Sequence, residues 1–315
     1  MANVKANGIS IEYEEFGPRN GPVILLIMGL GGQLPRWPAE FIANLTERGY
    51  RVIRYDNRDV GLSQKFEGAG VPQIAQIMAE AAQGKKINAE YSLDDMADDA
   101  AGLLVALGIG RAHIVGASMG GMIAQLVAAR HSDKIISLTS IMSSTGNPEL
   151  PPAKPEAMAV LMTRPPANDL KAIVDSGVKA ARVIGSPAYP AEEKTLRANI
   201  EADVKRSNYP AGFARQIAAV MKTGDRRAEL KKITAPTLVI HGLDDPLVPV
   251  QGGRDTAANI KGAELLEIPG MGHDLPAALY GQIADAIHGC ASRGRKLNGT
   301  LAEVYKVRAL SGAED

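Results

Sequence analysis

Short apolar runs alternate with amphipathic segments along most of this chain, and this alternation limits its fold more than any other feature. The run from Val23 to Met28 is apolar at every position and lies between Gly21-Pro22 and Gly29. Its length suits a strand, and its uniform apolar character indicates burial on both faces of a sheet. Buried strands separated by helices are typical of parallel sheets. We therefore predict an α/β fold with a doubly wound, mostly parallel sheet.

The same pattern places further elements along the chain. Ser92 is a suitable N-cap with Asp94-Asp95 in the first turn, so a helix is expected from there to Leu107, before Gly108. The other expected helices cover residues 41–48, 119–130, 251–260 and 276–288, and the expected strands cover residues 9–15, 23–28, 51–55, 113–116, 135–142, 237–241 and 264–268.

The alternation stops between Pro148 and Lys232. Prolines cluster in residues 148–166, helical periodicity follows, and no buried strand is recognisable before residue 237. We interpret this stretch as a helical insertion into the sheet domain. The C-terminal end, with a helix expected near residues 301–310, is interpreted as a free tail or as an oligomer contact, such as that of a homodimer. The predicted division is a first part of the core at 1–146, a helical cap or lid at 147–232, a second part of the core at 233–292 and a C-terminal tail at 293–315.

Composition excludes several classes of function. Lys and Arg together number 35, as do Asp and Glu, so no net positive charge attracts nucleic acid or anionic lipid. No apolar stretch reaches the roughly 18 residues of a membrane span, and the N-terminus lacks the apolar segment of a secretory signal. Cys290 is the single cysteine, so neither an internal disulfide nor a cysteine metal cluster can form. We expect a cytoplasmic protein without nucleic-acid or membrane partners.

A glycine-rich turn surrounds Ser118. The sequence Gly116-Ala-Ser-Met-Gly-Gly121 follows an expected strand and directly precedes an expected helix. A serine on so tight a turn needs glycines two positions before and after it, because a Cβ there would collide with neighbouring backbone. The turn would lift the Ser118 hydroxyl above the sheet edge, and the Met119 N–H would face developing negative charge. The pattern predicts a nucleophile at Ser118; the alternative is a serine that only caps the helix.

Glycines also follow the buried strand at residues 23–28. In Gly29-Leu-Gly-Gly32 the Leu30 N–H is free to act as a second oxyanion donor, while Gly31-Gly32 lets the chain turn away. The alternative is a phosphate-binding loop, but the lysine and Ser/Thr that complete that pattern are missing. We therefore expect Leu30 and Met119 to supply the two donors of an oxyanion hole.

Two later loops contribute an acid and a base. Asp245 follows the expected strand at residues 237–241 and directly precedes Pro246, which stiffens the turn, so its carboxylate is placed to accept a hydrogen bond from an imidazole. Asp244 competes for that role but is expected to act as a cap or to face solvent. Of the five histidines, His273 is the one on a glycine-flanked loop after the last expected strand. We predict His273 as the general base and Asp245 as the acid that orients it.

The chain order Ser118, Asp245, His273 distinguishes one superfamily from other hydrolases with the same three side chains. The sequence resembles the α/β-hydrolase superfamily over roughly residues 9–290, and more narrowly the esterases related to aclacinomycin methylesterase. The resemblance rests on Met28-Gly-Leu-Gly-Gly32 before Trp37-Pro38, on Arg54-Tyr-Asp-Asn-Arg-Asp-Val-Gly-Leu-Ser63, and on His113-Ile-Val-Gly-Ala-Ser-Met-Gly-Gly121.

The resemblance implies an eight-stranded sheet and a structural role for one acidic segment. Residues 55–61 offer carboxylates to a metal or base site, but in the resembling family this segment is a turn held by Asp56 and Arg58. No spacing of His, Asp or Glu elsewhere predicts a metal site. Many members of the superfamily carry His-Gly where this chain has Met28-Gly29, so no role of that histidine is transferred here.

Residues and resemblance together predict a serine hydrolase that cleaves small-molecule carboxylic esters through an acyl-enzyme, with no cofactor. His273 would take the proton of Ser118 as the hydroxyl oxygen attacks the ester carbonyl. Alternatives on the same fold are a cofactor-free haloperoxidase or perhydrolase, a C–C bond hydrolase, and a non-catalytic ligand-binding member. The residues expected to line an apolar substrate pocket are Met28, Gly29, Trp37, Met158 and Met162.

Overall fold

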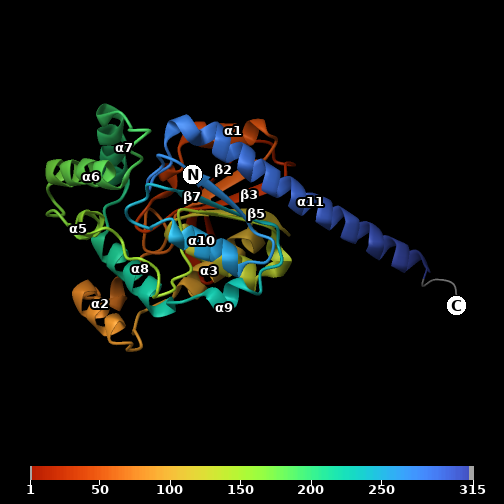
Figure 1. Ribbon diagram of the computed structural model, residues 1–315, viewed down its shortest axis with the longest axis horizontal. Coiled ribbons are helices and arrows are strands. Elements are labelled where there is room, and N and C mark those ends of the chain that lie inside the picture. Colours follow the sequence, from red (N-terminus) through yellow and green to blue (C-terminus); the bar gives the residue numbers. More distant parts are fainter. Residues whose placement is uncertain (1, 312–315) are drawn as a thin grey trace.

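The computed structural model describes residues 2–311, and the side chains of residues 2–295. Its centre is a sheet of eight strands in the order β1-β2-β4-β3-β5-β6-β7-β8 (Figure 1). The predicted α/β class and the number of strands are confirmed. The strands are β1 (Ala2–Ala6), β2 (Ile9–Phe16), β3 (Val23–Ile27), β4 (Arg51–Tyr55), β5 (Ala112–Ala117), β6 (Ile135–Ile141), β7 (Thr237–Gly242) and β8 (Glu264–Ile268).

Most of the sheet is parallel. The strands from β4 to β8 in the sheet order pair in parallel, whereas β1 with β2 and β2 with β4 pair antiparallel. The carboxyl ends of parallel strands share one edge of a sheet. The loops that follow β3, β5, β7 and β8 therefore meet at that edge.

Helices cover both faces of the sheet. One face carries α1 (Ala39–Glu47) and α11 (Tyr280–Ser311), and the other carries α3 (Leu93–Ala106), α4 (Met119–Arg130) and α10 (Gln251–Asn259) (Figure 1). Along β3, Leu25 and Ile27 pack on the side of α3 and α4, while Ile24 and Leu26 pack on the side of α1 and α11. This two-residue alternation between two apolar cores explains why the strand is apolar at every position.

Between β6 and β7 the chain forms helices and no strand, and the structure describes this whole stretch. The helices are α5 (Pro155–Met162), α6 (Leu170–Ile184), α7 (Glu193–Arg206), α8 (Pro210–Thr223) and α9 (Arg227–Leu230). In Figure 1, α5, α6 and α7 lie together beyond one end of the sheet, and α8 packs against α2 (Ile74–Ala82). We refer to residues 147–232 as the helical insertion.

The C-terminal helix differs from the sequence prediction. The sequence predicts a helix at residues 276–288 and another near 301–310, whereas the structure has the single helix α11. Glycines at 289, 294 and 299 each lower helix propensity by about 1 kcal/mol, but no proline interrupts the helix. Gly294 also lets α11 approach β6, because a Cβ there would overlap the Ile136 carbonyl oxygen. Residues 312–315, the end of the predicted tail, lie outside the described residues.

Candidate active site

The backbone around Ser118 forms a sharp turn between β5 and α4. Ser118 has φ 57° and ψ −123°, a backbone conformation that residues other than glycine rarely adopt. A Cβ on Gly116 would overlap the Gly120 carbonyl oxygen, and a Cβ on Gly120 would overlap that of Ile27. The Ser118 N–H donates to the Ile141 carbonyl at 2.9 Å, which ties the turn to β6. These contacts explain the glycines on both sides of the serine.

His273 connects Ser118 to Asp245 through hydrogen bonds. The His273 Nε2 lies 2.9 Å from the Ser118 Oγ, and its Nδ1 lies 2.7 Å from Asp245 Oδ2. Because a carboxylate only accepts, Nδ1 carries the proton and Nε2 is free to accept the serine proton. The structure thus brings together the three predicted side chains in the order that nucleophilic acyl transfer requires.

Asp245 is held more firmly than its neighbour Asp244. Its Oδ1 accepts hydrogen bonds from the N–H groups of Leu247 and Val248 at 2.9 and 2.8 Å, and its side chain is fully buried. Asp244 is exposed and accepts from the Gly270 N–H at 2.8 Å. The geometry therefore separates the two candidates: Asp245 faces the imidazole, and Asp244 closes a surface loop.

A second histidine lies beside Asp245 without competing for it. The His241 Nε2 is 3.6 Å from Asp245 Oδ2 but only 2.7 Å from the Val248 carbonyl oxygen, to which it donates. Burial lowers the pKa of His241, which keeps the ring neutral. The Asp245 carboxylate is therefore left to interact with His273.

The two backbone N–H groups predicted to form an oxyanion hole belong to segments that adjoin Ser118 in the chain or in space. Gly29 passes against the nucleophile, since a Cβ on it would lie 3.0 Å from the Ser118 Cβ. Leu30 follows in the same turn, and no acceptor for its N–H occurs within the part of the chain that the structure describes. Met119 is the first residue of α4, where N–H groups have no intrahelical acceptor. Of the two predicted donors, Leu30 thus lies on the loop that follows β3, and Met119 lies at the start of α4 directly after Ser118.

The helical insertion contacts the loop that carries His273. The His273 N–H donates to the Ile184 carbonyl at 2.7 Å. The Ser186 hydroxyl accepts from the Gly272 N–H at 2.9 Å and donates to Asp274 Oδ1. Burial raises the pKa of the Asp274 carboxyl. Sequence analysis missed these partners, and a pairing 86 residues apart leaves no local signal.

The predicted pocket residues fall into two groups. Met158 and Met162 on α5 are half-buried, and Gly29 adjoins Ser118. Trp37, in contrast, is fully buried in the core and stacks on Phe41 with ring centroids 5.7 Å apart. Met28 is nearly buried in the same core. Trp37 is therefore a packing residue of the core, and its buried ring offers no surface to a substrate.

The acidic segment at residues 55–61 has structural partners. Asp56 accepts from the N–H groups of Leu34 and Leu62, at 2.7 and 2.8 Å. Arg58 forms a buried ion pair with Asp99 at 2.6 Å.

Within residues 2–295 no group of three or more His, Cys, Asp or Glu side chains could hold a metal ion. No helix in the described residues has the length and apolar character needed to cross a membrane.

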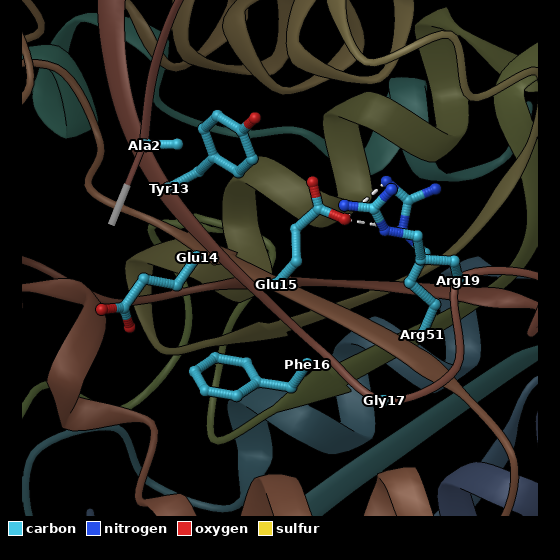
Figure 2. A pocket seen from close by; sticks show the side chains of 8 residues that line it. All are labelled: Ala2, Tyr13, Glu14, Glu15, Phe16, Gly17, Arg19 and Arg51. Carbon is cyan, nitrogen blue, oxygen red and sulfur yellow. Dashed lines mark hydrogen bonds and ion pairs between the residues drawn. The ribbon is translucent and has the colours of Figure 1, made fainter.

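A surface hollow of about 410 Å³ lies elsewhere on the molecule (Figure 2). Its lining includes Glu15 at the end of β2 and Arg51 at the start of β4, which form an ion pair at 2.6 Å. The start of β4 is at the amino edge of the parallel strands, whereas Ser118 follows the carboxyl end of β5. The hollow is thus distinct from the site around Ser118.

Comparison with known proteins agrees with this geometry. A family model described as the alpha/beta hydrolase fold matches residues 22–276. The chain belongs to this family. The superfamily resemblance inferred from the sequence is therefore confirmed.

Individual alpha/beta hydrolases are similar over most of the chain. It is 29% identical over 293 residues to rhodomycin D methylesterase DauP of Streptomyces sp. (strain C5), covering 86% of this chain and 90% of that protein. It is 26% identical over 284 residues to the bifunctional esterase/perhydrolase DCH of Acinetobacter calcoaceticus, covering 86% and 91%. The crystal structure of the enol-lactonase from Burkholderia xenovorans LB400 has a TM-score of 0.70 at 24% identity, over 92% of this chain and 100% of that one, which shows the fold.

Proposed function

We propose that this alpha/beta hydrolase cleaves carboxylic esters through an acyl-enzyme on Ser118. The observation that carries the proposal is the continuous hydrogen-bonded chain from Asp245 through His273 to Ser118. Similarity to a methylesterase over most of both chains supports the same reaction type.

The reaction has two halves. His273 removes the Ser118 proton as Oγ attacks the ester carbonyl, and the N–H groups of Leu30 and Met119 stabilise the tetrahedral oxyanion. The imidazolium then protonates the leaving alcohol, and an acyl-enzyme remains. Water, activated by His273 in the same way, hydrolyses the acyl-enzyme and regenerates the serine. Asp245 keeps the imidazole in the tautomer that both halves need.

The substrate pocket is proposed to lie between Ser118 and the helical insertion, which acts as a cap at residues 147–232. Half-buried Met158 and Met162 supply apolar surface from α5. A small or medium ester suits such a pocket, and a methyl ester is favoured by the methylesterase relative. A cytoplasmic location and a homodimer contact through residues 293–315 remain predictions from the sequence.

Two other activities would use the same acyl-enzyme or nucleophile. The name of the DCH relative includes perhydrolase activity, which would follow if hydrogen peroxide replaced water in the second half-reaction. C–C bond hydrolysis is a further alternative. Peracid formation, assayed beside ester hydrolysis, separates the perhydrolase from the esterase. A non-catalytic role is disfavoured because a ligand-binding protein has no need of an aligned acid, base and nucleophile.

Replacement of the nucleophile tests the proposal. Ser118→Ala should lower kcat on a p-nitrophenyl ester by on the order of 10⁶-fold, as in other serine triads. The fold should be unchanged, because alanine removes one atom at a half-buried position. Ser132→Ala, at an exposed position, is the matched control and should keep full activity. Activity of Ser118→Ala within tenfold of the wild type would contradict the proposal.

A further inference from the structure

Gln216 on helix α8 joins two loops of the core: residues 29–32, which we call the oxyanion loop, and the turn that contains Arg58. Its side chain is fully buried. Its Oε1 accepts from the Gly31 N–H at 2.8 Å, and its Nε2 donates to the Arg58 carbonyl oxygen at 2.9 Å. These partners fix the orientation of the amide, because a backbone N–H can only donate and a carbonyl oxygen can only accept. Both ends of the side chain are therefore satisfied by backbone groups outside its own helix.

The Gly31 N–H belongs to a tight turn that carries the proposed oxyanion donor. The Gly32 N–H donates to the Gly29 carbonyl at 3.1 Å, which makes Leu30 and Gly31 the two central residues of a β-turn. Gly31 has φ 64°, while Leu30 is not among the residues with positive φ. This combination defines a type II turn, in which the peptide between the central residues is turned over relative to type I. The direction of the Gly31 N–H thus distinguishes the two turn types.

A second residue of α8 packs against the same turn. A Cβ on Gly31 would lie 2.8 Å from the Phe213 ring. Phe213 and Gln216 are three residues apart, so they share one face of the helix. The turn is therefore covered by one face of α8, with a hydrogen bond from Gln216 and apolar contact from Phe213.

We infer that Gln216 is a positioning residue for the oxyanion hole, and that through it α8 controls how well the Leu30 N–H is aimed at the reacting carbonyl. This inference rests on the proposed function. With the Gly31 N–H bound, the type II turn is held, and Leu30 stays in place next to Gly29, which lies against Ser118. Without that acceptor the Leu30–Gly31 peptide is free to turn over. The turn then no longer fixes the direction of the neighbouring Leu30 N–H, and the tetrahedral oxyanion loses part of its stabilisation.

Two substitutions separate this role from a merely structural one. Gln216→Met keeps the length of the side chain and removes both hydrogen bonds. Gln216→Glu keeps an acceptor for the Gly31 N–H, which is the contact that the inference depends on, and as the protonated acid, which burial favours, it can also donate to the Arg58 carbonyl oxygen. Lys222→Met is the control from the same helix, since Lys222 donates to the Ala89 carbonyl at 2.9 Å and contacts neither loop of the site.

The variants are assayed with p-nitrophenyl butyrate and with an alkyl trifluoromethyl ketone, which forms a tetrahedral adduct with an active-site serine. Complete loss of a donor costs about 10²–10³-fold in kcat, so a misplaced donor should cost less. For Gln216→Met we expect kcat to fall by about 10- to 100-fold, KM to change by less than about threefold, and inhibition by the ketone to weaken by the same factor as kcat/KM falls. Gln216→Glu and Lys222→Met should stay within about threefold of the wild type.

The inference is overturned if Gln216→Met keeps kcat within twofold, if its loss appears in KM alone, or if ketone inhibition is unchanged. It is also overturned if Gln216→Glu loses as much kcat as Gln216→Met. Should Gln216→Met not fold, Gln216→Glu decides alone, and a tenfold loss of both kcat and ketone affinity counts against the inference. Failure of the proposed function is a separate result, because it would appear as esterase activity that survives Ser118→Ala.

Discussion

The proposed nucleophile Ser118 and acid Asp245 are held by the core, whereas the loops that carry His273 and Leu30 also contact the helical insertion. Ser118 is fixed by close backbone contacts among β3, β5, β6 and α4. The loop of His273 is hydrogen-bonded to Ile184 and Ser186, and the loop at residues 29–32 is hydrogen-bonded to Gln216, all three from the helical insertion.

This difference has a consequence for the role of the insertion. A cap that only shaped the pocket would change which substrates bind. A cap that also positions the proposed base His273 and the proposed oxyanion donor Leu30 should change the rate of the chemical step as well. Substitutions in the insertion therefore distinguish the two roles: a change in KM or in substrate preference indicates pocket shape, and a change in kcat indicates positioning of the catalytic groups.

Among substitutions that compare the two regions, the largest loss of kcat is expected at Asp245, the proposed acid, which the core supplies. Asp245→Asn should lower kcat by roughly 10³–10⁴-fold, because an amide in place of the carboxylate favours the wrong imidazole tautomer. Asp244→Asn is the matched control and should lose less than about threefold, since Asp244 is exposed and accepts from the Gly270 N–H, whereas the imidazole is bound by Asp245. Kinetics of both variants on one p-nitrophenyl ester provide the check, and the reverse ranking would transfer the acid role to Asp244.

An intermediate effect is expected in the pocket. Replacing Met158 or Met162 by Ala or Phe should shift the preferred acyl length across a series of p-nitrophenyl esters. One methylene in an apolar pocket is worth about 1–3 kcal/mol, so selectivity between neighbouring chain lengths should change by about tenfold or more. Met78→Ala on α2, outside the insertion, should leave the profile as it is. An unchanged profile in every Met158 and Met162 variant would remove α5 from the pocket.

The smallest effect is expected where the insertion contacts the His273 loop. Ser186→Ala removes the acceptor of the Gly272 N–H and the donor to Asp274, and a hydrogen bond contributes about 0.5–1.5 kcal/mol. We expect kcat to fall by about 3- to 10-fold with little change in KM. Thr195→Ala is the control, because its hydroxyl bonds Glu192 within the insertion itself. A rise in KM without a loss of kcat would mean that the contact shapes the pocket and does not position the base.

Local sequence patterns predicted the elements that carry the core of the site. The helix predicted at 119–130 is α4, and the glycines around Ser118 are required by backbone contacts within that turn. Asp245 was recognisable because it follows the buried strand β7 and precedes Pro246, and His273 because it lies on a glycine-flanked loop after the last strand. These signals are local, since they arise from residues within a few positions of each other.

Other features were not predictable because their causes lie far apart in the chain or are weak. The edge strand β1 is mostly exposed, so it has little apolar alternation. Trp37 was expected to add apolar surface to the pocket, but its ring packs on Phe41 in the core. Gln216 lies 185 residues from its partner Gly31. A single glutamine on a helix gives no sign of such a contact.

Labelling with a fluorophosphonate tests the central claim most directly, because the probe reacts covalently with an activated serine. The wild-type protein should gain the mass of one phosphonyl group, and peptide mapping should place it on Ser118. Ser118→Ala should gain none, and Asp245→Asn should react far more slowly than the wild type. Labelling at a different serine, or no labelling of an active wild-type enzyme, would contradict the account.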